Sequence, residues 1–193
     1  MKIEFIKNKD GIIINGPLLM TPKLFLDQRG IFMESWNKKL FNDLTGNKKE
    51  FVQDNYSISK KNILRGLHYQ ISPKPQGKLV KCVKGNIFDV VIDLRKNSKT
   101  FGLWSGFYLN DQNHKQIWIP QGFAHGFLTI SDEASVIYKV DEYWYKNLER
   151  SIRWNDPNLK ITWPTTKGEP ILSAKDKEAN LLYNLSDSDL FNF

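Results

Sequence analysis

The chain contains three histidines, and they are the first residues to consider for proton transfer near neutral pH. A histidine has an ordinary pKa of about 6.5, so it is mostly neutral and basic at pH 7. His114 lies in the polar stretch LNDQNHKQ, which is typical of a solvated surface. His68 in ILRGLHYQI and His125 in IPQGFAHGFLTI lie in apolar sequence, where an imidazole must find a partner. On sequence alone, a structural histidine with satisfied hydrogen bonds is the favoured interpretation of both.

Ligands for a metal ion are scarce in this sequence. Cys82 is the single cysteine, which excludes an internal disulfide and leaves no cysteine and histidine pattern with zinc-ligand spacing. A metal-binding β-barrel usually supplies paired histidines of the HxH kind together with a carboxylate on a nearby strand. The LHYQ segment offers only His68, so we expect no metal site.

The elements that must position the histidines are predicted to be strands. Residues 87–94, IFDVVIDL, alternate so that four apolar side chains share one face while Asp89 and Asp93 lie on the other. The run KLVKCV precedes this strand across a turn at Gly85, and short β-rich runs follow at QIWIP, GFLTI and SVIYKVDEYW. Several short strands at such spacing predict a mainly β protein with a sandwich, barrel or jelly-roll fold.

Two helices and a C-terminal tail complete the predicted elements. Residues 37–45 are expected to form a helix, because apolar side chains recur at helical spacing between a capping Asn37 and a terminating Gly46. A second helix is expected through KDKEANLLYNL near the C-terminus. The last residues, LSDSDLFNF at about 185–193, are expected to be loosely attached.

Length and composition indicate one folded domain over residues 1–193. The hydrophobic fraction of 40% argues against disorder, and 25% charged residues argue for a soluble protein. We find no long apolar run of the kind that spans a membrane and no secretion signal at the start, so a cytoplasmic location is expected. The net charge of +7 comes from scattered lysines, which indicates a solvated surface and no nucleic-acid tract. A few convergent Arg and Lys side chains would still suffice to bind a diphosphate.

Nine segments of the chain resemble one protein family in their order and spacing. In chain order they are DQRGIFMESW, FVQDNYS, LRGLHYQ, QGKLVKCVKGNIFDVVIDLR, TFG, IWIPQGFAHGFL, VIYK, IRWNDP and LSAKD. Together they resemble the dTDP-4-dehydrorhamnose 3,5-epimerases over roughly residues 21–176. The resemblance implies a cupin-like jelly-roll barrel that forms a homodimer and binds a dTDP-linked 4-keto-6-deoxy sugar. It implies an isomerase of dTDP-rhamnose biosynthesis that converts dTDP-4-dehydro-6-deoxyglucose to dTDP-4-dehydrorhamnose without an organic cofactor.

The residues in these segments have the chemistry that such a reaction requires. Protons on the carbons beside a ketone are acidic, because their removal gives an enolate whose charge rests on the ketone oxygen. Inversion needs a base, a cation or donor at that oxygen, and an acid on the opposite face. The resemblance assigns these roles to His68, Lys78 and Tyr138, and it assigns to Asp176 the orientation of the His68 imidazole.

Without the resemblance, these residues have ordinary interpretations. Lys78 would be an exposed lysine at a strand edge, and Asp176 a solvated carboxylate or helix cap. Tyr138 shares its predicted strand face with Val136 and Val140, so it is expected to point into the barrel, where its hydroxyl needs a partner.

The resemblance also implies a set of substrate-binding residues. They are Arg29, Glu34, Gln53, Asn55, Arg65, His125, Glu149 and Lys175. Arg65 and Arg29 are expected to bind the diphosphate, and the segment at residues 29–34 is expected to come partly from the partner subunit. A regular strand would place Arg65 and His68 on opposite faces, so both can reach one site only if Gly66 permits a bulge or bend.

The sequence departs from the family pattern at two places. The stretch EYWY has Trp144 where many members carry a second tyrosine, and this tryptophan is expected to stack on the base of the nucleotide. In DQRGIFME, Ile31 and Met33 replace aromatic residues that are common in the family. These changes bear on the identity of the nucleotide and the sugar substituents more than on the type of reaction.

Three other functions compete with this interpretation. An epimerase acting at one carbon would keep the His68 and Asp176 pair but change the supply of the acid. A ketoisomerase on a related barrel would move the carbonyl group instead of inverting a centre. A non-catalytic module that binds sugar nucleotides would use His68 and Tyr138 only for packing, but binding alone does not need a base and an acid on opposed faces.

The scarcity of metal ligands leads to a first prediction. Dialysis of the protein against a strong chelator should leave its epimerase rate intact, because the proposed base, donor and acid are all side chains. A large loss of rate that a divalent ion restores would contradict this prediction.

Overall fold

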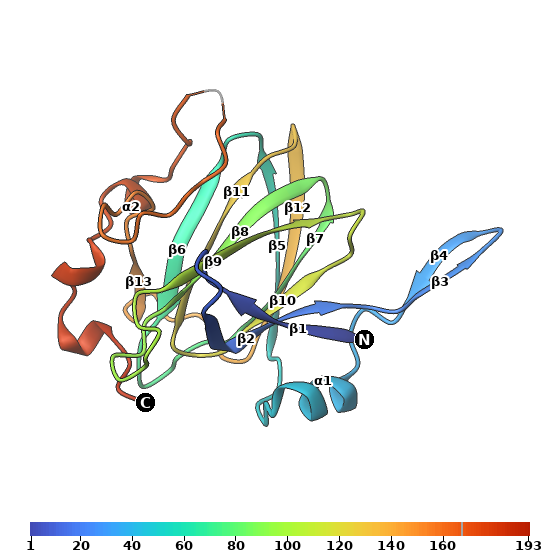
Figure 1. The fold of residues 1–193 in the computed structure, drawn as a ribbon, viewed down its shortest axis with the longest axis horizontal. Helices are drawn as coiled ribbons and strands as arrows, with labels where there is room; N and C mark the ends of the chain where they lie inside the picture. Colours follow the sequence, from blue (N-terminus) through green and yellow to red (C-terminus); the bar gives the residue numbers. More distant parts are fainter. Residues whose placement is uncertain (167) are drawn as a thin grey trace.

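The computed structural model describes residues 1–166 and 168–193, which form two facing sheets (Figure 1). The six-stranded sheet has the order β1-β2-β10-β7-β12-β5, and the five-stranded sheet has the order β13-β6-β11-β8-β9. Neighbouring strands in both sheets pair antiparallel. The expected mainly β, cupin-like jelly-roll barrel with a few short helices is confirmed.

The strands of the barrel and its hairpin are short. The six-stranded sheet consists of β1 (Lys2–Lys7), β2 (Ile13–Thr21), β10 (Gln116–Ile119), β7 (Lys78–Lys84), β12 (Glu133–Val140) and β5 (Gln53–Lys60). The five-stranded sheet consists of β13 (Glu149–Ser151), β6 (Leu64–Gln70), β11 (Phe123–Thr129), β8 (Asn86–Asp93) and β9 (Trp104–Asn110). A separate hairpin consists of β3 (Leu24–Asp27) and β4 (Gly30–Met33).

Strand β8 separates two hydrophobic cores. Ile87 and Val91 face the space between the sheets, whereas Phe88 and Val90 face a second core that the C-terminal segment covers. The predicted apolar alternation is therefore present. The opposite face, which carries Asp89, is not exposed, because it forms part of the barrel interior. A carboxylate in this position must be paired with another polar group.

The first predicted helix is confirmed as α1 (Lys38–Thr45). The Asn37 side chain accepts a hydrogen bond from the backbone of Leu40, and Gly46 ends the helix with a φ of 66°. Phe41 packs on Trp118 on the outer face of the six-stranded sheet.

The second predicted helix is wrong for most of its length. Only α2 (Ala174–Lys177) and the 3₁₀ turn η1 (Leu182–Asn184) form, and the chain between them leaves the helical path. There the carbonyl of Asn180 accepts a hydrogen bond from the backbone N–H of Arg153, and the Ala179 carbonyl accepts one from the Arg153 side chain. Tertiary hydrogen bonds thus replace the helical ones.

The end of the chain packs against the barrel, in contrast to the loose attachment expected for it. After the 3₁₀ turn η2 (Asp187–Asp189), the Phe191 side chain is only 2% exposed. Its backbone N–H donates to Leu94, and its carbonyl accepts from Lys96. An aromatic side chain of this size stabilises such an attachment by about 2 kcal/mol or more when it is buried.

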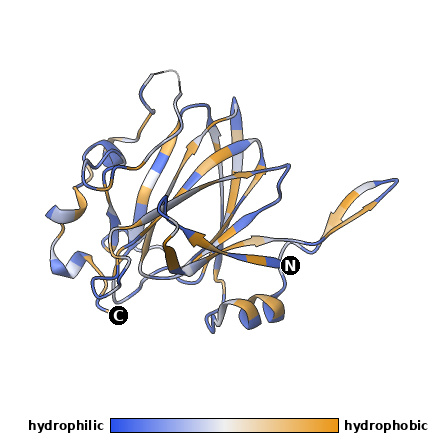
Figure 2. Cartoon of the chain, in the orientation of Figure 1, coloured by the Kyte–Doolittle hydropathy of each residue, from blue (hydrophilic) through white to orange (hydrophobic). Residues whose placement is uncertain are grey.

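The hairpin of β3 and β4 stands away from the barrel (Figure 1). Figure 2 shows that much of it is hydrophobic, and Leu26 and Phe32 are 74% and 68% exposed. A hydrophobic surface of this kind marks an interaction site. None of the described helices is long and apolar enough to cross a membrane.

Strand β6 contains the bulge that was expected at Gly66. Arg65 pairs with Phe127 and His68 pairs with His125, so two residues of β6 lie opposite Gly126 alone. Gly66 has a φ of +125°, and a Cβ there would lie 2.5 Å from the Cα of Gly126. Only glycine fits this conformation and this space. The bulge brings Arg65 and His68 to one cavity.

This geometry predicts that Gly66→Ala destabilises the protein by about 2–4 kcal/mol, because backbone strain and a backbone clash act together. Gly30→Ala is the matched control, since Gly30 has a φ of +123° but open space around its Cβ position. Denaturant unfolding measures both free energies. Equal losses in the two variants would show that the clash contributes nothing.

Candidate active site

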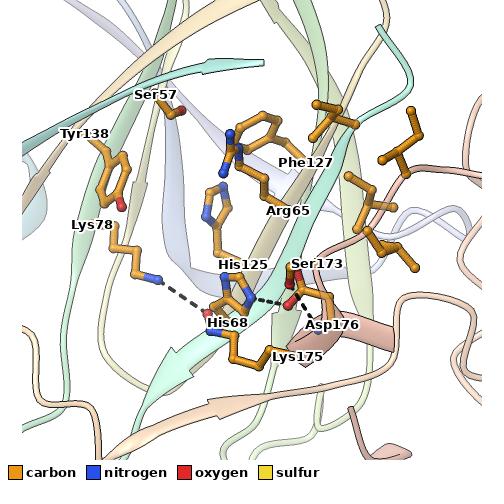
Figure 3. A pocket seen from close by; sticks show the side chains of 14 residues that line it. Ser57, Arg65, His68, Lys78, His125, Phe127, Tyr138, Ser173, Lys175 and Asp176 are labelled. Carbon is orange, nitrogen blue, oxygen red and sulfur yellow. Dashed lines mark hydrogen bonds and ion pairs between the residues drawn. The ribbon is translucent and has the colours of Figure 1, made fainter. Parts of the chain in front are cut away.

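A cavity of about 510 Å³ opens between the two sheets (Figure 3). Its walls come from strands of both sheets and from the segment that leads into α2. The residues that line it are Ser57, Ile63, Leu64, Arg65, His68, Lys78, His125, Phe127, Tyr138, Ile171, Leu172, Ser173, Lys175 and Asp176. Seven of the residues singled out in the sequence therefore meet in one place.

His68 and Asp176 form a close pair in this cavity. His68 Nε2 lies 2.6 Å from Asp176 Oδ1, although the two residues are 108 positions apart in the chain. The buried carboxylate favours the tautomer with the proton on Nε2, which leaves the Nδ1 lone pair able to accept a proton. Burial lowers the pKa of His68, and the hydrogen bond and charge of Asp176 oppose this effect. The imidazole is therefore neutral and basic near pH 7.

Asp176 is the charged member of this pair. Burial would raise the pKa of its carboxyl group, but hydrogen bonds from His68 and Ser173 and nearby positive charge hold it below its usual value. The carboxylate stays ionised near neutral pH and can stabilise a protonated His68.

Lys78 places a cation beside His68. Its Nζ donates to the backbone carbonyl of His68 at 3.4 Å, and its half-buried stem comes from β7 in the opposite sheet. Burial lowers the pKa of Lys78 to about 8, with a partly compensating effect of Glu149. The ammonium is therefore mostly charged at pH 7, and it can stabilise a negative oxygen in this partly desolvated cavity.

Tyr138 lies across the cavity from His68 (Figure 3). It occupies β12, where it pairs with Val80, two positions along β7 from Lys78 and on the same face. Val136 and Val140 on either side of it are fully buried, so its predicted inward direction is confirmed. Burial raises the pKa of Tyr138, so the phenol keeps its proton near neutral pH and can act as a donor.

A second His and Asp pair lies at the inner wall of the cavity. His125 Nε2 is 2.8 Å from Asp89 Oδ2, and both side chains are buried. Burial raises the pKa of Asp89, and the charge and hydrogen bond of His125 oppose this rise. Asp89 is a residue of the site that was not predicted from the sequence. The available signal was that Ile87 and Val91 share its strand face, which is unusual for a solvated face.

Positive side chains line the rim of the cavity. Arg65 Nε donates to Ser59 Oγ at 2.9 Å, and none of the ion pairs found among the described residues involves Arg65. Lys175 Nζ lies 2.9 Å from Glu149 Oε2, which connects α2 to β13. Arg65 is thus the side chain at the rim that can bind an anion without first breaking an ion pair.

Several predicted binding residues lie outside this cavity wall. Arg29 is at the tip of the hairpin, where its side chain is 88% exposed and paired with Asp27. Glu34 lies at the base of the hairpin, and Trp144 is exposed in the connection after β12. One chain therefore does not bring these three residues into contact with His68.

Gln53 and Asn55 lie nearer the site. They share the inward face of β5 with Ser57, and Asn55 pairs with Tyr138 across the strands. Gln53 donates to Asn55 at 2.8 Å. The amides are therefore neighbours of the proposed acid, although neither lines the cavity. Among the described residues, no group of three His, Cys, Asp or Glu side chains is arranged to hold a metal ion.

Comparison with known proteins identifies the family of this chain. The family model described as dTDP-4-dehydrorhamnose 3,5-epimerase matches residues 12–184. The chain belongs to this family. A dTDP-4-dehydrorhamnose 3,5-epimerase of Shigella flexneri is 54% identical over 159 residues, which cover 82% of this chain and 87% of the relative.

A solved structure and a relative of different specificity are also similar to this chain. A crystal structure of dTDP-6-deoxy-D-glucose-3,5-epimerase from Legionella pneumophila in complex with dTDP-4-keto-L-rhamnose matches with a TM-score of 0.91 and 42% identity. The match covers 100% of this chain and 99% of that one. A dTDP-4-dehydrorhamnose 3-epimerase of Streptomyces niveus is 37% identical over 92% of this chain and 84% of the relative.

The electrostatics of this epimerase site predict the effect of Asp176→Asn. The substitution keeps the shape of the side chain but removes the charge that raises the pKa of His68, so this pKa should fall further. NMR titration of the His68 ring measures the change. Asp54→Asn, which removes an ion pair with Lys139 on the outer face, should leave His68 unchanged. A raised His68 pKa in Asp176→Asn would contradict the pairing.

Proposed function

We propose that this protein epimerises carbons 3 and 5 of dTDP-4-dehydro-6-deoxyglucose to give dTDP-4-dehydrorhamnose. The observation that carries the proposal is the placement of His68 and Tyr138 on opposite sheets, facing one cavity from two sides, with Lys78 between the sheets. An inversion needs this arrangement, because the proton must leave one face of the sugar ring and return to the other. The identities of the family relatives support the same substrate class.

In the proposed mechanism, His68 Nδ1 takes a proton from a carbon beside the ketone. The electron pair of the broken C–H bond forms the enolate, and the positive charge of Lys78 stabilises the negative charge on the enolate oxygen. Tyr138 then donates its proton to the same carbon from the opposite face. Each inversion leaves His68 protonated and Tyr138 as a phenolate, so both must exchange protons with solvent before the next one.

The binding residues are assigned in the same proposal. Arg65 binds the diphosphate, and His125, Lys175 and Glu149 complete the sugar site. Gln53 and Asn55 extend the site along β5, and Trp144 stacks on the thymine base. These assignments follow the family resemblance, and the proximity of the first four residues to the cavity supports them.

The hairpin supports a homodimer as the active form. Its apolar side chains are exposed in the single chain. The hairpin stands away from its own chain's barrel, and Arg29 at its tip does not line that chain's cavity (Figure 1). A second copy of the chain would accept the hairpin, and Arg29 and Glu34 would then contribute to the partner's site. We propose a cytoplasmic location for the dimer.

Isotope exchange tests the reaction. In heavy water, the product should carry deuterium at both carbons beside the ketone, because each new proton comes from a group that exchanges with solvent. Mass spectrometry and stereochemical analysis of the reduced product measure label and inversion together. Inversion at one carbon would favour a single-centre epimerase, and neither exchange nor inversion would favour a non-catalytic binding module.

Two substitutions separate the base from the acid. His68→Ala should abolish exchange while nucleotide binding remains, because the anchoring residues lie elsewhere. Tyr138→Phe should still exchange deuterium into the sugar, since His68 and Lys78 remain, but inversion should fall sharply. Near-normal turnover by His68→Ala would remove His68 from its proposed role.

The pH dependence of kcat/KM follows from the two shifted groups. His68 must be neutral, and burial lowers its pKa, so the acid limb should lie below the ordinary value for histidine. Lys78 must be charged, so activity should fall as the pH rises through about 8. Lys78→Arg should remove this alkaline limb because arginine stays protonated, whereas Lys81→Arg on the outer face should keep it. An unchanged alkaline limb in Lys78→Arg would exclude Lys78 as its source.

A further inference from the structure

The carboxylate partner of His68 comes from a segment with little regular structure. Backbone hydrogen bonds hold this segment at Ile171, which donates to Asn62 at 2.8 Å, and at Asn180, which accepts from Arg153 at 2.9 Å. Between these points α2 has only four residues. A helix this short is not stable by itself, so local contacts must set its orientation.

Packing and ion pairing contribute little to that orientation. Asp176 is the only buried residue of α2. The ion pair between Lys175 and Glu149 involves a lysine side chain that is 48% exposed, and ion pairs at the surface contribute little. The helix turn that presents Asp176 is therefore held mainly by its hydrogen bonds.

Ser173 supplies the hydrogen bond at the start of this turn. Its Oγ accepts from the backbone N–H of Asp176 at 3.2 Å, and its own backbone is extended. The donor of the capping bond thus belongs to the residue whose carboxylate contacts His68. Ser173 also lines the cavity, where it lies beside Asp176 (Figure 3).

We propose that Ser173 is a positioning residue for the epimerisation. By capping α2 it fixes the backbone of Asp176, and thereby the direction of the carboxylate toward His68. The 2.6 Å contact between the two side chains requires such control, because a small rotation of the turn would lengthen it. This inference rests on the proposed function and does not require Ser173 to contact the substrate.

Ser173→Ala tests the inference in two ways. The kcat should fall on the order of tenfold while KM changes little, as expected for loss of a cap that orients a catalytic group. In the ligand-free protein, NMR titration should give a lower pKa for His68. The charged groups that face His68 are Asp176, Lys175 and Lys78, and only Asp176 raises its pKa. Displacing that carboxylate leaves burial and two cations to lower it.

Two further variants complete the test. Ser173→Thr keeps a capping hydroxyl and should restore both kcat and the His68 pKa. Ser186→Ala removes the hydroxyl at the N-cap of η2, which donates to the Asp189 carboxylate at 2.6 Å, and should change neither value. Failure of Ser173→Thr to rescue the loss would overturn the inference.

The proposed function and the inference can fail separately. An unmodified protein that does not epimerise the sugar nucleotide would overturn the proposed function. If the unmodified protein is active but Ser173→Ala changes neither kcat nor the pKa of His68, the role of Ser173 alone is overturned.

Discussion

The hydrogen bond between His68 and Asp176 is the contact on which the site depends. In a partly buried cavity the protonated imidazole loses solvation, which lowers the pKa of His68 and weakens it as a base. The Asp176 carboxylate opposes this effect and selects the tautomer. Two features of the fold meet at this contact: the bulge at Gly66 that turns His68 toward the cavity, and the C-terminal segment that brings Asp176 to it.

The cavity holds two side chains whose pKa values burial shifts in opposite directions. Burial lowers the pKa of Lys78 and raises the pKa of Tyr138, so two values that are ordinarily similar move apart. A lysine that still carries its proton can stabilise an oxyanion, and a tyrosine that keeps its proton can supply it. In the proposed reaction, burial keeps the proton on Tyr138, whereas Lys78 keeps its charge near pH 7 in spite of its burial.

The two sheets carry different residues of the site. The five-stranded sheet carries His68, His125 and Asp89, and the six-stranded sheet carries Lys78 and Tyr138. Because facing sheets pack at a nearly constant separation, they can hold a base and an acid on two sides of one sugar ring. The hairpin that leaves the six-stranded sheet exposes apolar surface that the chain itself does not cover, which is consistent with a site completed by a second copy.

The sequence by itself determined what depends on local pattern. The period of apolar residues predicted the strand at 87–94, the caps at Asn37 and Gly46 predicted α1, and ordered motifs identified the family. Only the tertiary structure decided what depends on distant contacts. It buried Asp89 on a strand face that seemed polar, ended the second predicted helix through bonds to Arg153, and attached the C-terminus through Phe191. The physical reason is that burial and hydrogen-bond partners come from residues far away in the chain, whereas spacing and capping act between neighbours.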